Sequence, residues 1–232
     1  MMHLSLREEG RSPKPTYIVI EDGEIKFQDA VHIWGKDTFE TEDVIKKNHG
    51  QEFHVLSIGP AGENLVRYAC ISHDKGREFG RCGGGAVMGS KKLEAVAIVG
   101  HGKMQVAQPD EFTEFVGELN AKIKERLKFL SEYGTPAMMA ATNTTGTLPT
   151  RYWTEGQFEG FENINAEAIK KKIMKKSKAC FACMVACRRV CKVENGRYTS
   201  TQIDGPEYET LYAFGSLCGN DNLESIVKAN EL

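Results

Sequence analysis

The segment Gly80–Val99, GRCGGGAVMGSKKLEAVAIV, joins a glycine-rich loop to a run of apolar and β-branched residues. The run Leu93–Val99 is typical of a buried strand. Six glycines lie between Gly76 and Gly89, and glycines let main-chain N–H groups approach a phosphate-bearing ligand closely, to which Arg81 adds a planar donor fork. A tight connection between two elements is the commoner reason for such a loop, and both interpretations stay open. No Walker or dinucleotide-binding pattern is present.

The first hundred residues contain both strand-like and helix-like sequence patterns. Asp22-Gly23 separates two short alternating runs, which is a hairpin signal. A helix is predicted from Asp37, at capping-box spacing from Glu40, to a stop at Gly50. We therefore predict an α+β domain in this region. Its predicted strands are Thr16–Ile20, Glu24–Phe27, Phe53–Ile58, Val66–Ile71 and Leu93–Val99.

Helical periodicity dominates the second half of the chain. Between Pro109 and Tyr133 apolar residues recur at three- and four-residue steps, which predicts one long helix that ends at Gly134. The fold class is therefore α+β, with an N-terminal sheet-and-helix domain at 1–104 and part of a mainly helical domain at 105–232. Further helices are predicted at Asn165–Lys176, Glu207–Gly215 and Asn222–Leu232.

Composition excludes several classes of protein. Hydrophobic residues make up 41% and charged residues 27% of the chain, as in ordinary globular proteins. A net charge of −2 provides no general attraction to nucleic acid or anionic lipid. The apolar runs are far shorter than a bilayer span, and Met1–Arg11 lacks the apolar core of an export signal. We expect a cytoplasmic protein with no nucleic-acid or membrane partner.

Four of the seven cysteines form a C-x2-C-x3-C-x3-C pattern within Cys180–Cys191. Thiolates this close together suit an iron–sulfur cluster. Structural zinc, which usually joins two C-x2-C pairs through a longer loop, and unmetallated thiols are the alternatives. The spacing places the first three thiols on one side of a turn-to-helix segment, so Cys191 is either a fourth ligand or a core residue.

Four motifs, in order, resemble the aldehyde:ferredoxin oxidoreductases, and the resemblance extends from Pro15 to Leu232. Four separate motifs in one order argue against chance similarity. The motifs are Ile58–Leu65, the loop Gly80–Lys91 with Leu93–Ala97 after it, Cys180–Cys187, and Asp204–Thr210.

The resemblance implies a tungsten (or molybdenum) ion held by two pterin dithiolenes, beside a [4Fe–4S] cluster. It further implies oxidation of a small-molecule aldehyde to a carboxylic acid, with electrons leaving through ferredoxin. The residues that carry over by motif are Arg81, Gly83 and Gly84 as pterin contacts, Cys180, Cys183 and Cys187 as ligands of three irons, and Glu209 as the carboxylate near tungsten that transfers protons.

The resemblance also implies that the chain is an internal fragment. The family's N-terminal region, which adds pterin contacts, would precede Met1, and its C-terminal half, which supplies the fourth cluster cysteine, would follow Leu232. We expect this chain by itself to be inactive, and a full-length form is compatible with a homodimer. Glu207 is expected to be structural because it points to a different side of its helix from Glu209. Cys218 is expected to be a buried structural thiol.

Two alternatives stay open. A family member with other chemistry, such as reductive dearomatisation of an aryl thioester, would use the same cofactor. A non-catalytic metal-binding module would instead be an electron carrier with four local cysteines or a zinc domain. Cys191 discriminates between enzyme and module, because only the module needs it as a ligand.

Overall fold

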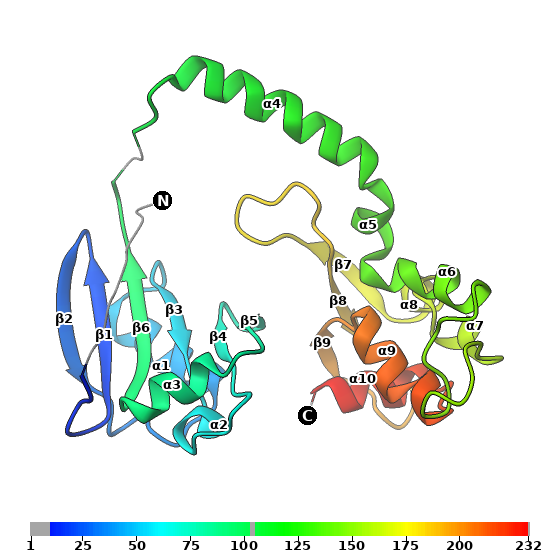
Figure 1. Cartoon of the computed structure of the whole chain (residues 1–232), viewed down its shortest axis with the longest axis horizontal. Helices are drawn as coiled ribbons and strands as arrows, with labels where there is room; N and C mark the ends of the chain where they lie inside the picture. Colours follow the sequence, from blue (N-terminus) through cyan, green and yellow to red (C-terminus); the bar gives the residue numbers. More distant parts are fainter. Residues whose placement is uncertain (1–9, 103–104, 232) are drawn as a thin grey trace. The chain divides into compact units, whose positions relative to one another are not determined.

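The structure, a computed structural model, describes residues 10–102 and 105–231. The beginning of the chain, considered above for an export signal, and Leu232, the end of the last predicted helix, lie outside these residues. The chain divides into two compact units, Met1–Val106 (unit 1) and Ala107–Leu232 (unit 2) (Figure 1). Among the described residues, no helix has the length and apolar character needed to cross a membrane.

Unit 1 is built from the elements β1 (Thr16–Glu21), β2 (Glu24–Asp29), α1 (Thr38–His49), β3 (His54–Ser57), α2 (Pro60–Glu63), β4 (Ile71–His73), β5 (Arg77–Phe79), α3 (Gly84–Ser90) and β6 (Leu93–Val99). Within residues 10–102, six strands form one mixed sheet in the order β2-β1-β6-β3-β4-β5. Strands β1 and β6 are parallel, whereas the other neighbours are antiparallel.

The sheet is covered on both faces at β1, whereas the edge strand β2 is largely exposed. Successive side chains of a strand point to opposite faces, and β1 is buried on both. Tyr17 and Val19 belong to a core that includes Ile45 of α1, whereas Ile18 packs in a second core with Met88 of α3. In Figure 1, α3 lies in front of the sheet. Burial on both faces explains why β1 reads as an almost continuous apolar run.

The predicted hairpin and first helix are confirmed. Asp22 and Gly23 both have positive φ, 47° and 92°, as a two-residue hairpin turn requires. The side chain of Asp37 accepts hydrogen bonds from the N–H groups of Phe39 (2.9 Å) and Glu40 (2.8 Å), and Gly50 caps the other end of α1. These local signals determine their own elements because they satisfy the backbone groups at the helix ends.

The strand predicted at Val66–Ile71 is wrong. The backbone of this segment is engaged in turns: Val66 N donates to Ala61 O at 2.9 Å, and Ala69 N donates to Val66 O at 2.9 Å. The strand β4 begins only at Ile71. This segment does not pair as a strand despite its β-rich composition, because its backbone N–H groups form hydrogen bonds within local turns.

Unit 2 contains helices and a small sheet: α4 (Pro109–Arg126), α5 (Lys128–Tyr133), the 3-10 helix η1 (Thr135–Ala137), α6 (Met138–Thr144), α7 (Phe161–Ile164), α8 (Ala166–Lys172), β7 (Met174–Lys178), β8 (Arg188–Lys192), β9 (Gln202–Asp204), α9 (Tyr208–Phe214), the 3-10 helix η2 (Ser216–Cys218) and α10 (Leu223–Glu231). The overall α+β class is confirmed, but the antiparallel sheet β7-β8-β9 was not predicted.

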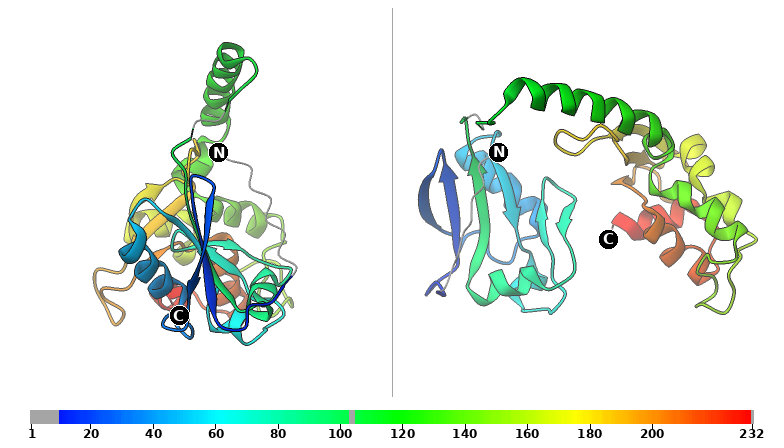
Figure 2. Two further views of the ribbon diagram at one scale, coloured as in Figure 1. Left: turned by 90° about the vertical axis from the view of Figure 1, so that its left-hand side faces the viewer. Right: turned by 45° about the horizontal axis from the view of Figure 1, so that its top comes forward.

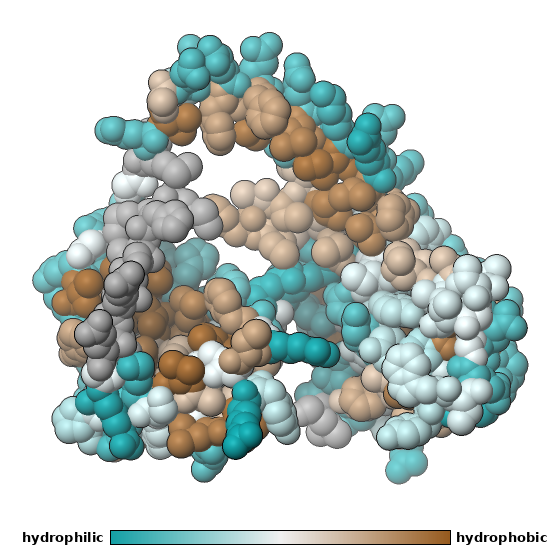
Figure 3. Space-filling model, viewed as in Figure 1, coloured by the Kyte–Doolittle hydropathy of each residue, from teal (hydrophilic) through white to brown (hydrophobic). Residues whose placement is uncertain are grey.

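Two predicted helices of unit 2 differ in extent from the observed ones. The long helix is interrupted at Leu127 (φ −106°, ψ 22°), which separates α4 from α5. The helix predicted at Asn165–Lys176 ends at Lys172, because the residues after Ile173 pair with β8. Figure 3 shows the two faces of α4, one apolar and one polar, and its apolar residues Phe112 and Phe115 are exposed.

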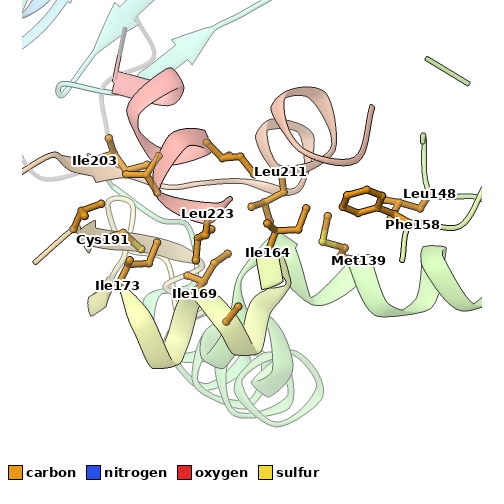
Figure 4. Packing of buried hydrophobic residues seen from close by; sticks show 14 residues of the cluster. Met139, Leu148, Phe158, Ile164, Ile169, Ile173, Cys191, Ile203, Leu211 and Leu223 are labelled. Carbon is orange, nitrogen blue, oxygen red and sulfur yellow. The ribbon is translucent and has the colours of Figure 1, made fainter. Parts of the chain in front are cut away.

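The core of unit 2 gathers side chains from the sheet and the surrounding helices. In Figure 4, Cys191 of β8 packs among Ile173, Ile203 of β9 and Leu223 of α10. All four side chains are buried. The apolar face of α10 therefore belongs to this core. It packs against the sheet β7-β8-β9, which was not predicted from the sequence.

Candidate functional site

The glycine-rich loop leads directly into α3. Gly83, just before the helix, has a left-handed backbone with φ 72°. A Cβ at Gly83 would overlap the carbonyl oxygen of Arg67, and a Cβ at Gly84 would lie 3.2 Å from Ile71 Cδ1. Glycine is thus required at position 83 by conformation and by close approach together.

The glycines further along α3 are also explained by packing. A Cβ at Gly85 would overlap the carbonyl oxygen of Cys70, and one at Gly89 would overlap that of Gly62 in α2. The N–H of Gly85 donates to Ala69 O at 3.0 Å. A tight connection therefore accounts for Gly83, Gly85 and Gly89, whereas a Cβ at Gly80 would meet no atom of the described residues within 4 Å.

Arg81 differs from the glycines beside it. Its side chain is exposed, and among the described residues it has no hydrogen-bonding or ionic partner. Nearby in the chain, Arg77 has a buried Nη2 without a hydrogen-bond partner in the described part. A guanidinium has five donors matched to phosphate and planar acceptors. Arg81 therefore fits the role of a contact to a pterin or its phosphate, with donors that the fold does not use.

The cysteine loop connects β7 to β8 and extends from the sheet as the gold segment of Figure 2. It is a strand-to-strand loop, so the predicted turn-to-helix setting is wrong. Cys180 is exposed, and Cys183 and Cys187 are half-buried. The residues before the last two, Ala182 and Ala186, share a left-handed backbone with φ 52°. The same turn thus precedes both Cys183 and Cys187.

The three cysteines of this loop are not gathered into a preformed metal site in the described part of the chain. Within residues 10–102 and 105–231, no group of three or more His, Cys, Asp or Glu side chains lies close enough together to hold a metal ion. A four-iron cluster spreads its ligands around a larger cube, and left-handed turns of this kind aim backbone N–H groups at anionic iron–sulfur sites. The assignment of Cys180, Cys183 and Cys187 as cluster ligands therefore stays a prediction.

Cys191 does not share this setting. Its thiol is fully buried in the apolar core, and burial raises its pKa to about 12. Metal ligation requires the thiolate, which an apolar surrounding disfavours. Of the two interpretations open for Cys191, the structure favours the core residue. Cys218, expected to be buried, is exposed, and its Sγ donates to Ala213 O at 3.2 Å.

The cysteine loop and the acidic motif meet at one corner of unit 2. Arg189, two residues after Cys187, is 1% exposed, and its carbonyl oxygen accepts from Gly205 N at 2.7 Å. Burial lowers the pKa of the Arg189 guanidinium, while the neighbouring Cys187 and Glu207 side chains oppose that shift. Sequence reasoning missed Arg189, since nothing in the pair Arg188-Arg189 indicates which of the two side chains is buried.

The acidic motif is held at the same corner. The hydroxyl of Thr135 donates to the carboxylate of Glu207 and accepts from Tyr208 N at 2.9 Å. These contacts agree with the structural role predicted for Glu207. Glu209, in the first turn of α9, is exposed, and it has no hydrogen-bonding or ionic partner among the described residues. Its carboxylate is therefore available for chemistry.

Unit 1 contains a buried carboxyl that the sequence did not single out. Glu94, the second residue of β6, is 0% exposed and lies where the β1–β6 register shifts. Neither carboxyl oxygen has a hydrogen-bond partner in the described part of the chain. Burial first, and the nearby Glu63 second, raise the pKa of Glu94 to about 8. Glu94 is therefore protonated at neutral pH.

Known proteins resemble both units. The family model "Aldehyde ferredoxin oxidoreductase, N-terminal domain" matches residues 6–100, and "Aldehyde ferredoxin oxidoreductase, domains 2 & 3" matches residues 114–232. In solved structures, the fold resembles the active-site complex BamBC of benzoyl coenzyme A reductase in complex with 1,5-dienoyl-CoA. That match has a TM-score of 0.69 at 24% identity and covers 96% of this chain and 35% of the other.

Curated relatives agree with the family models. The tungsten-containing aldehyde ferredoxin oxidoreductase of Thermococcus kodakarensis is 41% identical over 96% of this chain, and that of Pyrococcus furiosus is 39% identical over 97%. The aliphatic sulfonate oxidoreductase, WOR-like subunit, of Pyrococcus furiosus is 27% identical over 94%. The chain spans 37% of the length of each of these relatives. The chain belongs to the aldehyde ferredoxin oxidoreductase family.

Proposed function

We propose that this chain carries part of the cofactor apparatus of a tungsten-pterin oxidoreductase that oxidises an aldehyde to a carboxylic acid. The reaction consumes one water and releases two protons and two electrons, and the electrons pass through a [4Fe–4S] cluster to ferredoxin. The observation that carries the proposal is the contrast between three accessible cysteines in one loop and the buried Cys191. Family membership and the tungsten-containing relatives support it.

Each proposed role follows from the chemistry of the residue. Arg81, with Gly83 and Gly84 beside it, donates hydrogen bonds to a pterin or its phosphate. Glu209 accepts a proton released during the oxidation. The bound metal supplies the two-electron redox step. In this assignment the pterin contacts come from residues 1–104 and the cluster ligands, Cys180, Cys183 and Cys187, come from residues 105–232.

The non-catalytic module is the less favoured candidate. An electron carrier with an entirely local cluster needs four thiolates from the cysteine segment. Its fourth ligand would be Cys191, whose thiol lies in an apolar core and whose raised pKa opposes ionisation. A carrier also has no use for the exposed carboxylate of Glu209. An enzyme in which the loop supplies three ligands accounts for these residues together.

Anaerobic reconstitution with iron and sulfide tests the proposal. Because the loop supplies three of the four ligands a [4Fe–4S] cluster needs, the wild-type chain should take up a labile cluster. Cys187→Ala should lose most of the bound iron and acid-labile sulfide, whereas Cys191→Ala should bind as much as the wild type. A stable four-iron cluster that Cys191→Ala abolishes would contradict the enzyme assignment and establish the local-cluster module.

A further inference from the structure

One buried side chain, that of Arg189, connects the cysteine loop to the rest of unit 2. The Arg189 guanidinium lies within hydrogen-bonding distance of five acceptors, three of which belong to segments more than ten residues away. Its acceptors are Leu130 O (2.8 Å), Ser131 O (3.0 Å), Ala186 O (3.1 Å), Arg188 O (2.8 Å) and Ser177 Oγ (3.4 Å). One planar group thus joins the end of α5, strand β7 and the loop residue that precedes Cys187.

These contacts fix the backbone just before Cys187 and so determine the direction of its side chain. Ala186, whose carbonyl oxygen accepts from Arg189, has the left-handed backbone (φ 52°) from which Cys187 follows. At the same corner, a Cβ at Gly134 would lie 2.8 Å from Cys187 O and 3.4 Å from Arg189 Cζ. A left-handed alanine is held against its own preference and persists only when its surroundings determine it.

The same residue joins the loop to the acidic motif. Arg189 O accepts from Gly205 N at 2.7 Å, which places the loop beside the start of the Gly205–Glu209 motif. Thr135, next to Gly134, holds the other end of that motif through Glu207 and Tyr208. The corner therefore sets the distance between the candidate cluster ligands and the candidate base.

The charge of Arg189 acts on the loop as well. A guanidinium keeps its proton in proteins, and this one is 1% exposed and follows Cys187 by two residues in the chain. Its Nε is a buried donor without a partner among the described residues. A net positive charge and N–H donors near the sulfurs favour the reduced, more negative form of an iron–sulfur cluster.

We propose that Arg189 is a positioning residue, which holds the cysteine loop in its ligand-binding shape and raises the reduction potential of the cluster through its charge. This inference rests on the proposed function, because it assumes that Cys187 binds a cluster. The matched substitutions are Arg189→Lys, which keeps the charge but cannot span five acceptors, and Arg189→Met, which removes the charge. Arg197→Lys is the control, since Arg197 is exposed in the same unit.

The test uses the full chain, first without metal and then reconstituted with iron and sulfide. In Arg189→Lys, hydrogen exchange should be several-fold faster in residues 179–187 and 205–209 than in the wild type, and a ferrous chelator should remove iron several-fold faster. Thermal unfolding should stay cooperative. The midpoint potential should stay close to the wild-type value in Arg189→Lys and fall in Arg189→Met, while Arg197→Lys should match the wild type throughout.

Other outcomes have distinct meanings. Equal exchange, iron release and potential in all variants would overturn the positioning role, and loss of cooperative unfolding in Arg189→Lys would overturn it in favour of a general structural role. If the wild type takes up no cluster, the proposed function fails on that ground. Hydrogen exchange of the metal-free chain then decides the positioning role by itself.

Discussion

The glycine-rich loop of unit 1 and the cysteine loop of unit 2 both stand out in the sequence, because each repeats one residue type at close spacing. Their structures differ. The glycines at positions 83, 85 and 89 are required by the close approach of neighbouring carbonyl oxygens, whereas Cys180, Cys183 and Cys187 stay accessible in a loop between two strands. Packing therefore accounts for these three glycines, whereas nothing in the packing of the loop, among the described residues, requires cysteine at positions 180, 183 and 187.

The largest expected effect tests the residues that packing leaves available. In an enzyme completed to the length of the relatives, Glu209→Gln should keep its tungsten but lose turnover by roughly two to four orders of magnitude, since a carboxylate that moves a proton is replaced by a neutral amide. Tungsten per chain and aldehyde-dependent reduction of a viologen dye measure the two quantities. Glu207→Gln is the control and should retain most of its turnover. Near-normal turnover in Glu209→Gln would remove that residue from the mechanism.

The next effect concerns the interior of unit 1. Burial raises the pKa of Glu94 to about 8 from an ordinary 4.5, so the folded chain keeps this proton to a higher pH than the unfolded chain. The contribution of Glu94 to the free energy of unfolding of unit 1 should therefore be greatest below pH ~4.5 and fall by ~4 kcal/mol as the pH rises to ~8. Glu94→Gln cannot ionise and should lack this slope.

Urea denaturation followed by Trp34 fluorescence, in a Trp153→Phe background, measures the stability of unit 1 at each pH. Glu78→Gln is the matched control, because Glu78 is exposed and its substitution should leave the slope unchanged. Equal stability of the parent chain at pH 5 and pH 8 would refute a neutral, buried Glu94.

A pair of glycine substitutions tests the packing explanation directly. Gly89→Ala places a methyl group against the carbonyl oxygen of Gly62 and should lower the stability of unit 1 by about 3 kcal/mol. Gly117→Ala, within α4, meets nothing within 4 Å and should stabilise its helix by up to ~1 kcal/mol. Both are measured by urea denaturation. If Gly89→Ala costs no more than Gly117→Ala, the glycines of the loop are not required by packing.

The smallest effect on stability is expected at Arg81. Because its side chain is exposed and has no hydrogen-bonding or ionic partner among the described residues, Arg81→Ala should change the stability of unit 1 by less than ~0.5 kcal/mol. In a completed enzyme the same substitution should reduce tungsten content, since pterin or phosphate acceptors lose a charged donor. Arg126→Ala, at an exposed position of α4, should leave the tungsten content unchanged. Normal tungsten content in Arg81→Ala would exclude the cofactor contact.

The sequence by itself determined the features whose signals are local. The hairpin at Asp22-Gly23 and helix α1 with its Asp37 cap follow from turn and capping chemistry that acts within a few residues. The order of the four motifs was sufficient to identify the family. The cysteine spacing pointed to metal chemistry because ligand type is a property of the residues themselves.

Tertiary structure decided which groups are buried and what they pair with. Strand β7 exists because β8, which follows it after the cysteine loop, supplies hydrogen-bond partners that outweigh the helical pattern of Asn165–Lys176. Burial separates Cys191 from Cys187, although the two look equivalent in the spacing. The role of Arg189 depends on acceptors more than fifty residues away at Leu130 and Ser131. Burial and pairing belong to contacts between distant segments, and no local pattern encodes them.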